Sequence, residues 1–311
     1  MPPQQNLPFV ILPELVAVAV AYRNKKLIAD QVLPRVPVGR QLFMYSVYDL
    51  GQGFTVPDTK VGRKSLPNEV DFSETAVTAS TEDFGLDDFV PQVDIENAPP
   101  NYDPRARAVE GIIGLVDLDR EVRAANLVFN SASYATANQQ TLVGTSQWSS
   151  PTCNPIEQIM DALDQCVMRP THGVLGRAAW TSLRTNPQVV AAVLKNPGMY
   201  GVADSKSVAD LLELDDIFIG DGWVNTAKKG QNPNLQRCWG PHASFIYRDA
   251  IPDVKGRVTF GFTAQFGHRF AGAIEEPKRG LRGGETVRAG ESVLEVISAQ
   301  DLGYFFQNVT A

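Results

Sequence analysis

The sequence predicts an α+β fold, and three patterns along the chain support that prediction. Residues 103–135 keep a helical periodicity, whereas residues 51–100 show none and are rich in Thr, Val, Asp and Pro. Further on, apolar residues alternate strictly with other residues from 258 to 266, as they do in a half-buried strand. We therefore expect a projecting hairpin, a long helix, a mixed domain and closing strands, in that order.

The bulk composition narrows the class of protein. The chain has 311 residues, of which 43% are hydrophobic and 20% charged, and a net charge of −7, values typical of a foldable globular protein. The negative charge argues against a protein that coats nucleic acid through excess Lys and Arg. Three widely spaced cysteines predict no disulfide framework or zinc site and favour a reducing compartment. The N-terminal apolar run of about 14 residues is too short to span a bilayer.

The region before the long helix combines strand propensity with segregated charge. The runs "RQLFMYSVYDL" and "EVDFSETAVTAS" are typical of strands that flank an extended loop. Residues 23–64 contain eight basic and three acidic residues, whereas residues 65–104 contain ten carboxylates and no Lys or Arg. Two interpretations stay open: solvated loop faces, or a basic part that docks on the acidic part of a neighbouring copy.

A helix start signal opens the long periodic segment, because Asp103 can cap free amides and Pro104 is tolerated in the first turn. A helix over residues 103–135 would be roughly 45–50 Å long, which is unusual in a compact enzyme. Its predicted buried face is Val109, Ile112, Ile113, Val116, Leu118, Val122, Ala125 and Phe129. The charged residues expected away from that face are Arg105, Arg107, Glu110, Asp119, Arg120 and Arg123. The helix is thus amphipathic.

The remainder of the chain predicts shorter elements. Asn154 and Pro155 start a helix, and residues 172–198 suggest a short strand followed by one or two helices. Residues 207–223 predict a helix and then a strand that ends in an Asp-Gly turn. After further strands, residues 281–306 are interpreted as a set of short strands punctuated by glycine.

The sequence offers no positive support for catalysis, a cofactor or a metal. His172, His242 and His268 are far apart, and the single Cys238/His242 pair does not make a zinc site. "GQGFTV" has a valine where a dinucleotide-binding loop needs its third glycine, and "VGRKS" lacks the spacing of a phosphate-binding loop. We therefore expect no catalytic residue, no metal and no cofactor.

Seven segments occur in an order that resembles a known family. They are the extended loop at residues 45–83, the helix from Asp103, and then "GTSQWSSPTCNPIEQIMDAL", "AAWTSLRTNPQVV", "LLELDDIFIGDGWVNTAKKG", "CWGPHASFIY" with "FGFTAQFG", and "DLGYFFQNV". Together with the N-terminal arm, this order resembles the major capsid proteins of tailed double-stranded DNA bacteriophages, which have the Hong Kong-type head fold. The resemblance covers nearly the whole chain.

The resemblance implies a domain organisation. Residues 1–40 would form an N-terminal arm, and residues 41–100 the extended loop with its flanking strands. Residues 101–150 and 275–311 would form a peripheral domain with the long spine helix, and residues 151–274 an axial domain.

The resemblance also implies a function. Copies would assemble as hexamers and pentamers into an icosahedral shell around double-stranded DNA, which the shell touches only loosely. The implied partners are other copies, a separate scaffold, a portal and possible decoration proteins, with no membrane. The protein would be part of the virion and assemble in the cytoplasm of the bacterial host.

The resemblance selects contact residues between copies. In the loop these are Phe54, Val56, Lys60, Arg63, Lys64 and Phe72, and on the spine Arg105, Arg107 and Arg123. Some members of the family cross-link copies through Lys and Asn, but no partner Asn is identifiable here for Lys60 or Lys64. Two other classes stay open: an encapsulin-type nanocompartment shell, and a cytosolic α+β enzyme whose site is not legible.

Overall fold

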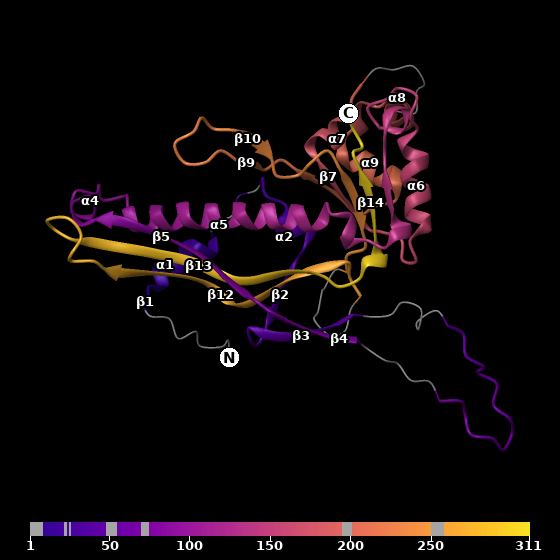
Figure 1. Ribbon diagram of the computed structural model, residues 1–311, viewed down its shortest axis with the longest axis horizontal. Coiled ribbons are helices and arrows are strands. Elements are labelled where there is room, and N and C mark those ends of the chain that lie inside the picture. The colour runs from indigo at the N-terminus through magenta and orange to yellow at the C-terminus, as the bar shows by residue number, and fades with distance from the viewer. Residues whose placement is uncertain are drawn as a thin grey trace.

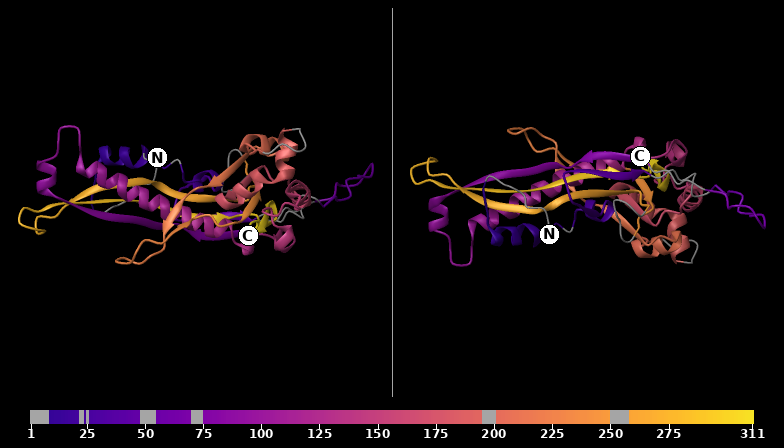
Figure 2. Two further views of the ribbon diagram at one scale, coloured as in Figure 1. Left: turned by 90° about the horizontal axis from the view of Figure 1, so that it is seen from above. Right: turned by 90° about the horizontal axis from the view of Figure 1, so that it is seen from below.

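The molecule is elongated, with a long sheet and a long helix at one end and a second, more compact domain at the other (Figure 1). The computed structural model describes residues 9–21, 24, 26–47, 55–69, 75–194, 201–249 and 258–311. Seen from above and from below, the long half is narrow relative to its length (Figure 2). Helices and strands are both present, and the α+β fold class is confirmed.

The long half is built on a five-stranded sheet. Its strands are β1 (Val10–Ile11), β2 (Arg35–Val38), β5 (Glu82–Pro91), β12 (Gly261–Glu275) and β13 (Gly284–Ile297). The path runs β1-β12-β13-β5 in antiparallel pairs, and β2 pairs in parallel with β12. The helices on this half are α1 (Pro13–Ala21), α2 (Ala29–Val32), α4 (Gln92–Glu96) and α5 (Pro104–Val128). The spine helix α5 covers one face of the sheet, where Val109, Ile113 and Val116 pack with Val287 and Ala289 of β13.

The spine helix begins where the sequence predicts but ends earlier. The Asp103 carboxylate accepts a hydrogen bond from the Arg105 amide at 2.9 Å, and Pro104 occupies the first turn. The helix ends at Val128, and a 3₁₀ turn follows over Ser131–Ser133. The prediction of an unbroken helix to residue 135 is therefore wrong. Asn130 accepts a hydrogen bond from the Ala132 amide and so offers the backbone an alternative to the helix. The 25 helical residues span about 37 Å.

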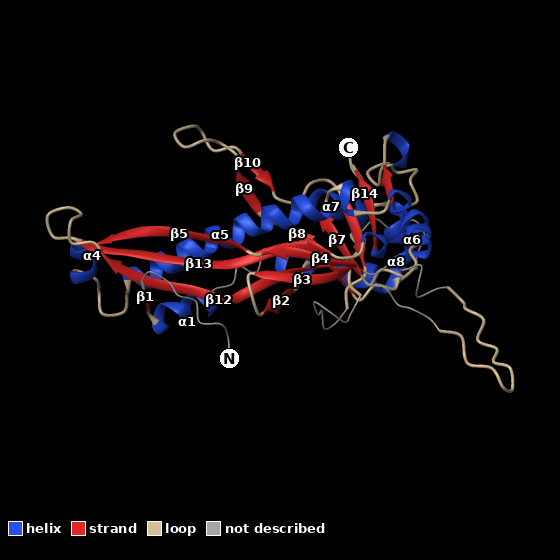
Figure 3. Cartoon of the chain, turned by 60° about the horizontal axis from the view of Figure 1, so that its bottom comes forward, coloured by secondary structure: helices blue, strands red, loops and turns tan. Residues whose placement is uncertain are grey.

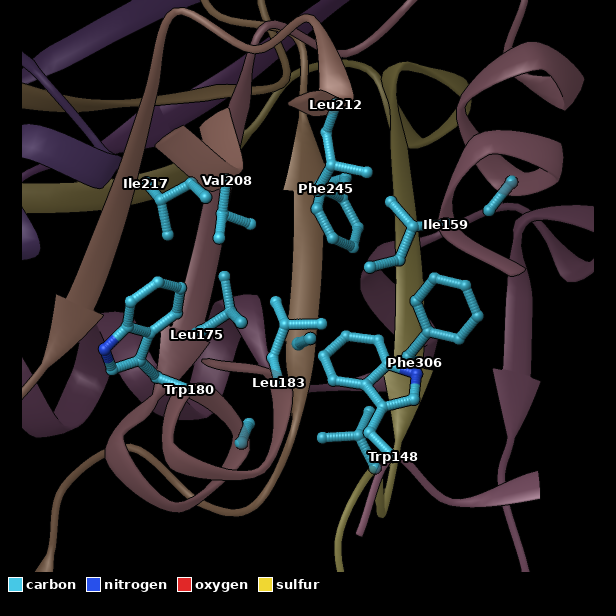
Figure 4. Close-up of a cluster of buried hydrophobic side chains, with 14 of the residues drawn as sticks. Trp148, Ile159, Leu175, Trp180, Leu183, Val208, Leu212, Ile217, Phe245 and Phe306 are labelled. Carbon is cyan, nitrogen blue, oxygen red and sulfur yellow. The ribbon is translucent and has the colours of Figure 1, made fainter. Parts of the chain in front are cut away.

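The second domain combines another five-stranded sheet with four helices. The strands, in sheet order, are β6 (Gln139–Thr141), β14 (Gly303–Gln307), β11 (Ala243–Ile246), β7 (His172–Gly176) and β8 (Asp216–Gly220). The helices are α6 (Pro155–Gln165), α7 (Arg177–Thr185), α8 (Pro187–Leu194) and α9 (Ser205–Leu212), and 3₁₀ turns lie at Thr136–Asn138, Gly144–Ser146 and Gln300–Leu302. Trp148, Trp180, Phe245 and Phe306 fill its core (Figure 4).

Two thin ribbons leave this body. The strands β3 (Leu42–Val47) and β4 (Thr75–Ser80) pair antiparallel and form the stem of a segment that projects beyond the second domain (Figures 1 and 3). The strands β9 (Trp223–Asn225) and β10 (Leu235–Arg237) form a separate hairpin on the side of the sheet that carries α5 (Figure 1). The short helix α4 lies inside the region where the sequence shows no helical periodicity, because five residues are too few to produce one.

The C-terminal strands differ from the prediction. Residues 284–297 form one strand instead of several short strands punctuated by glycine. A Cβ at Gly284 would collide with the carbonyl oxygen of Val90, and a Cβ at Gly290 with that of Phe84. These glycines therefore permit the close approach of β5 and do not end the strand.

The two five-stranded sheets do not follow the boundaries of the expected domain ranges. β12 lies almost entirely in the expected axial range 151–274 but pairs with β13 in the long sheet. β14 lies in the expected peripheral range 275–311 but pairs with β11 and β6 in the second domain. Such pairings join residues distant in sequence, so local patterns do not reveal them.

The glycines of the long half give a stability prediction. Gly290→Ala should lower the free energy of unfolding by about 1–3 kcal/mol, because β13 must shift away from Phe84. The matched control is Gly111→Ala on the spine helix, where a Cβ meets no atom within 4 Å. It should raise stability by up to about 1 kcal/mol. Chemical unfolding of the unassembled chain, followed by circular dichroism, measures both; equal midpoints would contradict the strand geometry.

Candidate assembly surfaces

A buried carboxylate joins three parts of the chain. Glu121 of α5 is fully buried, and its oxygens accept hydrogen bonds from the amides of Ile28 at 3.0 Å and Ala29 at 2.8 Å. The same side chain accepts a hydrogen bond from the Trp239 indole at 2.6 Å. Burial raises the pKa of Glu121, and the three donors only partly offset this effect. The contacts tie the N-terminal segment and the second domain to the spine.

The neighbouring residue Arg120 is also buried, with 2% of its surface exposed. Its guanidinium donates hydrogen bonds to the Leu33 carbonyl at 3.2 Å and the Thr263 hydroxyl at 2.9 Å, and it pairs with Asp30. The expectation that Arg120 lies away from the buried face is therefore wrong. A buried cation is tolerated here because several acceptors converge on it.

A second buried carboxylate clamps β2 to the sheet. Glu291 of β13 receives two hydrogen bonds from Arg35, at 2.7 and 3.1 Å, and one from Arg269 at 2.9 Å. Burial alone would raise the pKa of Glu291, but the two guanidinium groups outweigh it and hold the pKa below its usual value. Arg269 also pairs with Asp117 of α5. The cluster locks the arm, the spine and the sheet into one rigid unit.

This ionic cluster borders a cavity of about 750 Å³, whose lining includes Asp30, Arg35, Arg120 and His268. The three charged groups named here already pair within the chain. Within the described ranges, no group of three or more His, Cys, Asp or Glu side chains could hold a metal ion. In the same part of the chain, no helix has the length and apolar character needed to cross a bilayer.

The projecting segment, residues 55–69, lies outside any core. Every residue in it is exposed, including Val56 at 90% and Leu66 at 91%. The expected contact residues Lys60, Arg63 and Lys64 also lie here and are exposed. Phe54 and Phe72 lie outside the described residues. The segment thus presents apolar and basic side chains that its own chain does not cover.

The expected spine residues fall into two groups. Arg107 has a side chain that is 68% exposed, and among the described residues it pairs only with Glu110, one turn away, at 3.4 Å. Arg123 instead pairs with Glu295 at 3.1 Å and lies 3.6 Å over the ring of Phe84. Arg105 pairs with Asp103 and, at 3.7 Å, with Glu285. Arg105 and Arg123 therefore fasten the spine to its own sheet, whereas Arg107 faces outward.

The structure adds two surfaces that the sequence analysis missed. On the β9–β10 hairpin, Trp223 and Leu235 are exposed, and Arg237 stacks on Trp223 at 3.9 Å. At the far end of the long sheet, the β12–β13 connection exposes Leu281 almost completely. Strand alternation at 223–225 and 235–237 is too short to signal a hairpin from sequence.

The surface of the isolated chain is larger than that of a compact monomer. The accessible area is 17887 Å², whereas a compact protein of 33.9 kDa exposes about 13,000 Å². The difference arises from the thin long half and the ribbons (Figures 1 and 2). A chain of this shape leaves much of its surface to be buried against other molecules.

The chain is similar to known proteins in both sequence and structure. The major capsid protein of Pseudomonas phage JBD67 is 56% identical over 306 residues, covering 98% of this chain and 99% of that protein. A phage-related protein from Bordetella bronchiseptica RB50 has the same fold, with a TM-score of 0.76, 21% identity and coverage of 97% and 98%. The capsid structure of cyanophage P-SCSP1u matches with a TM-score of 0.60, 9% identity and coverage of 98% and 92%. No family model matches the chain.

The Glu291 clamp predicts a pH-dependent contribution to stability. Because the folded pKa of Glu291 lies below 4.5, the unfolded chain binds this proton more readily. The stabilisation is complete above pH 4.5 and is lost as the pH falls through the folded pKa. Glu291→Gln should cost about 3 kcal/mol at pH 7, since two guanidinium groups lose their shared partner.

The control for the clamp is Glu110→Gln, which alters the exposed Arg107–Glu110 pair on helix α5 and should cost less than about 0.5 kcal/mol. Urea unfolding of the unassembled chain between pH 3.5 and 7 measures both effects. A difference between wild type and Glu291→Gln that does not shrink on acidification would count against the clamp.

Proposed function

The chain belongs to the major capsid proteins of bacteriophages, and from that membership we propose that its copies assemble as hexamers and pentamers into an icosahedral head. The head encloses the double-stranded DNA genome of the phage. The protein is a structural component of the virion, and the proposal assigns it no enzymatic activity, metal or cofactor.

One observation carries the assembly proposal: the projecting segment, residues 55–69, buries nothing in its own chain. Ordering an extended segment costs conformational entropy, and exposed apolar residues such as Val56 and Leu66 give no stabilisation in a monomer. Burial of these apolar residues against a neighbouring copy would supply the missing stabilisation and offset the entropy cost. Val56, Lys60, Arg63 and Lys64 are the proposed contact residues, together with Phe54 and Phe72, which flank the segment in the sequence.

The two sheets support a division of labour within the subunit. We assign the long sheet, α5 and the N-terminal arm to the peripheral domain of the capsid fold. We assign the β6-β14-β11-β7-β8 sheet and its helices to the axial domain, around which hexamers and pentamers form. The hydrogen bonds to Glu121 and the ion pairs of Glu291 keep the peripheral domain rigid enough to act as a shell tile.

The charge of the subunit suits a container more than a DNA-binding coat. A net charge of −7 per copy repels packaged phosphate, so contact with the genome is loose and protein–protein burial holds the shell together. Arg107 on the outer side of the spine is a candidate for contact with DNA or a neighbour. The proposed further partners are a separate scaffold, a portal and possible decoration proteins, and assembly takes place in the host cytoplasm.

Two alternatives make different predictions about purified material. An encapsulin-type shell would contain a cargo protein in place of nuclease-protected DNA. An α+β enzyme would turn over a substrate as a monomer and form no large assemblies on sedimentation. The proposed function expects particles that protect double-stranded DNA of genome length.

Deletion of residues 53–68, closed by a short Gly-Ser linker, should leave a folded subunit that forms no closed shells. The described residues within the deletion, 55–68, contribute nothing to the hydrophobic cores. Sedimentation and negative-stain microscopy measure shells, and a thermal midpoint within about 2 °C of wild type controls for folding. Normal shells from this variant would contradict the role of the segment.

A further inference from the structure

We propose that the loop joining β12 and β13, residues 276–283, docks on helix α4 of another copy. We call these residues the tip loop, because they lie at the end of the long sheet opposite the projecting segment (Figure 1). The inference rests on the proposed function, since it concerns how shell subunits meet. It identifies a second contact, separate from that of residues 55–69.

The tip loop presents an apolar apex between unpaired cations. Leu281 is 98% exposed, more than any other large apolar side chain in the described ranges. Lys278 and Arg282 are exposed, and neither forms an ion pair with another described residue. A monomer gains nothing from this arrangement, whereas an interface gains from burying the leucine and pairing the cations.

The loop is held in a defined shape. The Glu276 amide donates to the Gly284 carbonyl at 2.8 Å, and the Arg279 amide donates to the Glu276 carbonyl at 3.3 Å. Gly280 and Gly283 have φ angles of 65° and 72°, which glycine adopts without strain. The Arg279 guanidinium lies 5.0 Å over the ring of Phe89. A preformed loop loses little entropy when it binds.

Helix α4 offers the complementary surface. Its exposed side includes Val93, Asp94 and Glu96, and Asp88 at the end of β5 is exposed nearby. No side chain in the described part of the chain pairs with Asp94 or Asp88, and Glu96 accepts only a hydrogen bond from Gln92 at 3.2 Å. The patch therefore combines an apolar residue with carboxylates, as an acceptor for Leu281 and its flanking cations requires.

The two surfaces lie at the same end of the chain but do not satisfy each other. The Gln92 amide donates to the Gly283 carbonyl at 3.1 Å, which fixes α4 beside the loop. Within the described residues, no ion pair joins Lys278 or Arg282 to a carboxylate of α4. Each copy can therefore give its loop to one neighbour and receive a loop from another, and such contacts close around a symmetry axis.

Charge reversal tests the pairing in the full-length chain, expressed with the other head genes of its phage. Lys278→Glu with Arg282→Glu should reduce the yield of closed shells at least tenfold, and Asp94→Lys with Glu96→Lys should do the same. Combining all four substitutions should restore shells. Thermal midpoints of the unassembled variants, expected to match wild type, exclude misfolding as the cause.

A matched control reverses two exposed cations to which no contact is assigned. Lys228→Glu with Lys229→Glu, added to Asp94→Lys with Glu96→Lys, should give no rescue. Wild-type yields from the Lys278/Arg282 variant would overturn the inference. A loss that the α4 variant does not rescue would assign the loop to another partner and would also overturn it. Failure of the wild-type chain to form any shell would instead reject the proposed function.

Cysteine pairing gives an independent measurement. Leu281→Cys and Val93→Cys are made as single variants and co-assembled, so that a disulfide between them can only join two copies. Oxidised shells of the mixture should contain disulfide dimers that shells of either variant alone do not. The native Cys153 and Cys166 are buried, and these single-variant samples also control for Cys238. Closed mixed shells without such dimers would count against the contact.

Discussion

The structure depends on a buried carboxylate whose three hydrogen-bond donors come from two distant parts of the chain. Glu121 lies in the spine helix, its amide donors belong to Ile28 and Ala29 at the start of α2, and its indole donor belongs to Trp239 of the second domain. Loss of the carboxylate would leave these donors buried without a partner, which is more costly than the loss of an ordinary hydrogen bond. One side chain thus sets the positions of arm, spine and second domain.

The contacts of Glu121 and the nearby ion pairs keep the body of this thin molecule rigid, so that it can carry exposed projections. The long half has a single layer of helix over a single sheet, so apolar burial alone gives it a modest core. The ion pairs of Arg35 with Glu291 and of Arg269 with Asp117 add directional contacts that fix β2 and α5 on the sheet. The projecting segment and the tip loop can then remain uncovered without loosening the body that carries them.

The sequence predicts what is local and misses what is long-range. The start of α5 follows from its Asp103 cap, and the α6 helix from its first-turn proline and periodicity, although Asn154 forms no capping hydrogen bond. The extended loop follows from composition, and the fold family from the order of seven segments. A helical-wheel analysis that places every charged residue outside does not predict the burial of Arg120. Its position nevertheless continues the buried stripe of Val109, Ile113 and Val116. Its acceptors, Leu33 and Thr263, come from segments that only folding brings together.

The proposed contacts are dispersed, which suits a subunit that stays free until assembly begins. Among the described residues, the most exposed large apolar side chains are Val56, Leu66 and Leu281. They lie on narrow projections at opposite ends of the molecule and not in one continuous patch. Each copy also carries a net charge of −7, and at low ionic strength the repulsion between two copies opposes any single weak contact. In the proposed shell each copy makes several such contacts at once. After the first contact forms, the groups of the next are already held close together, so the total affinity is much higher than that of one contact. The same side chains can thus leave a lone subunit unassociated and hold a complete shell together.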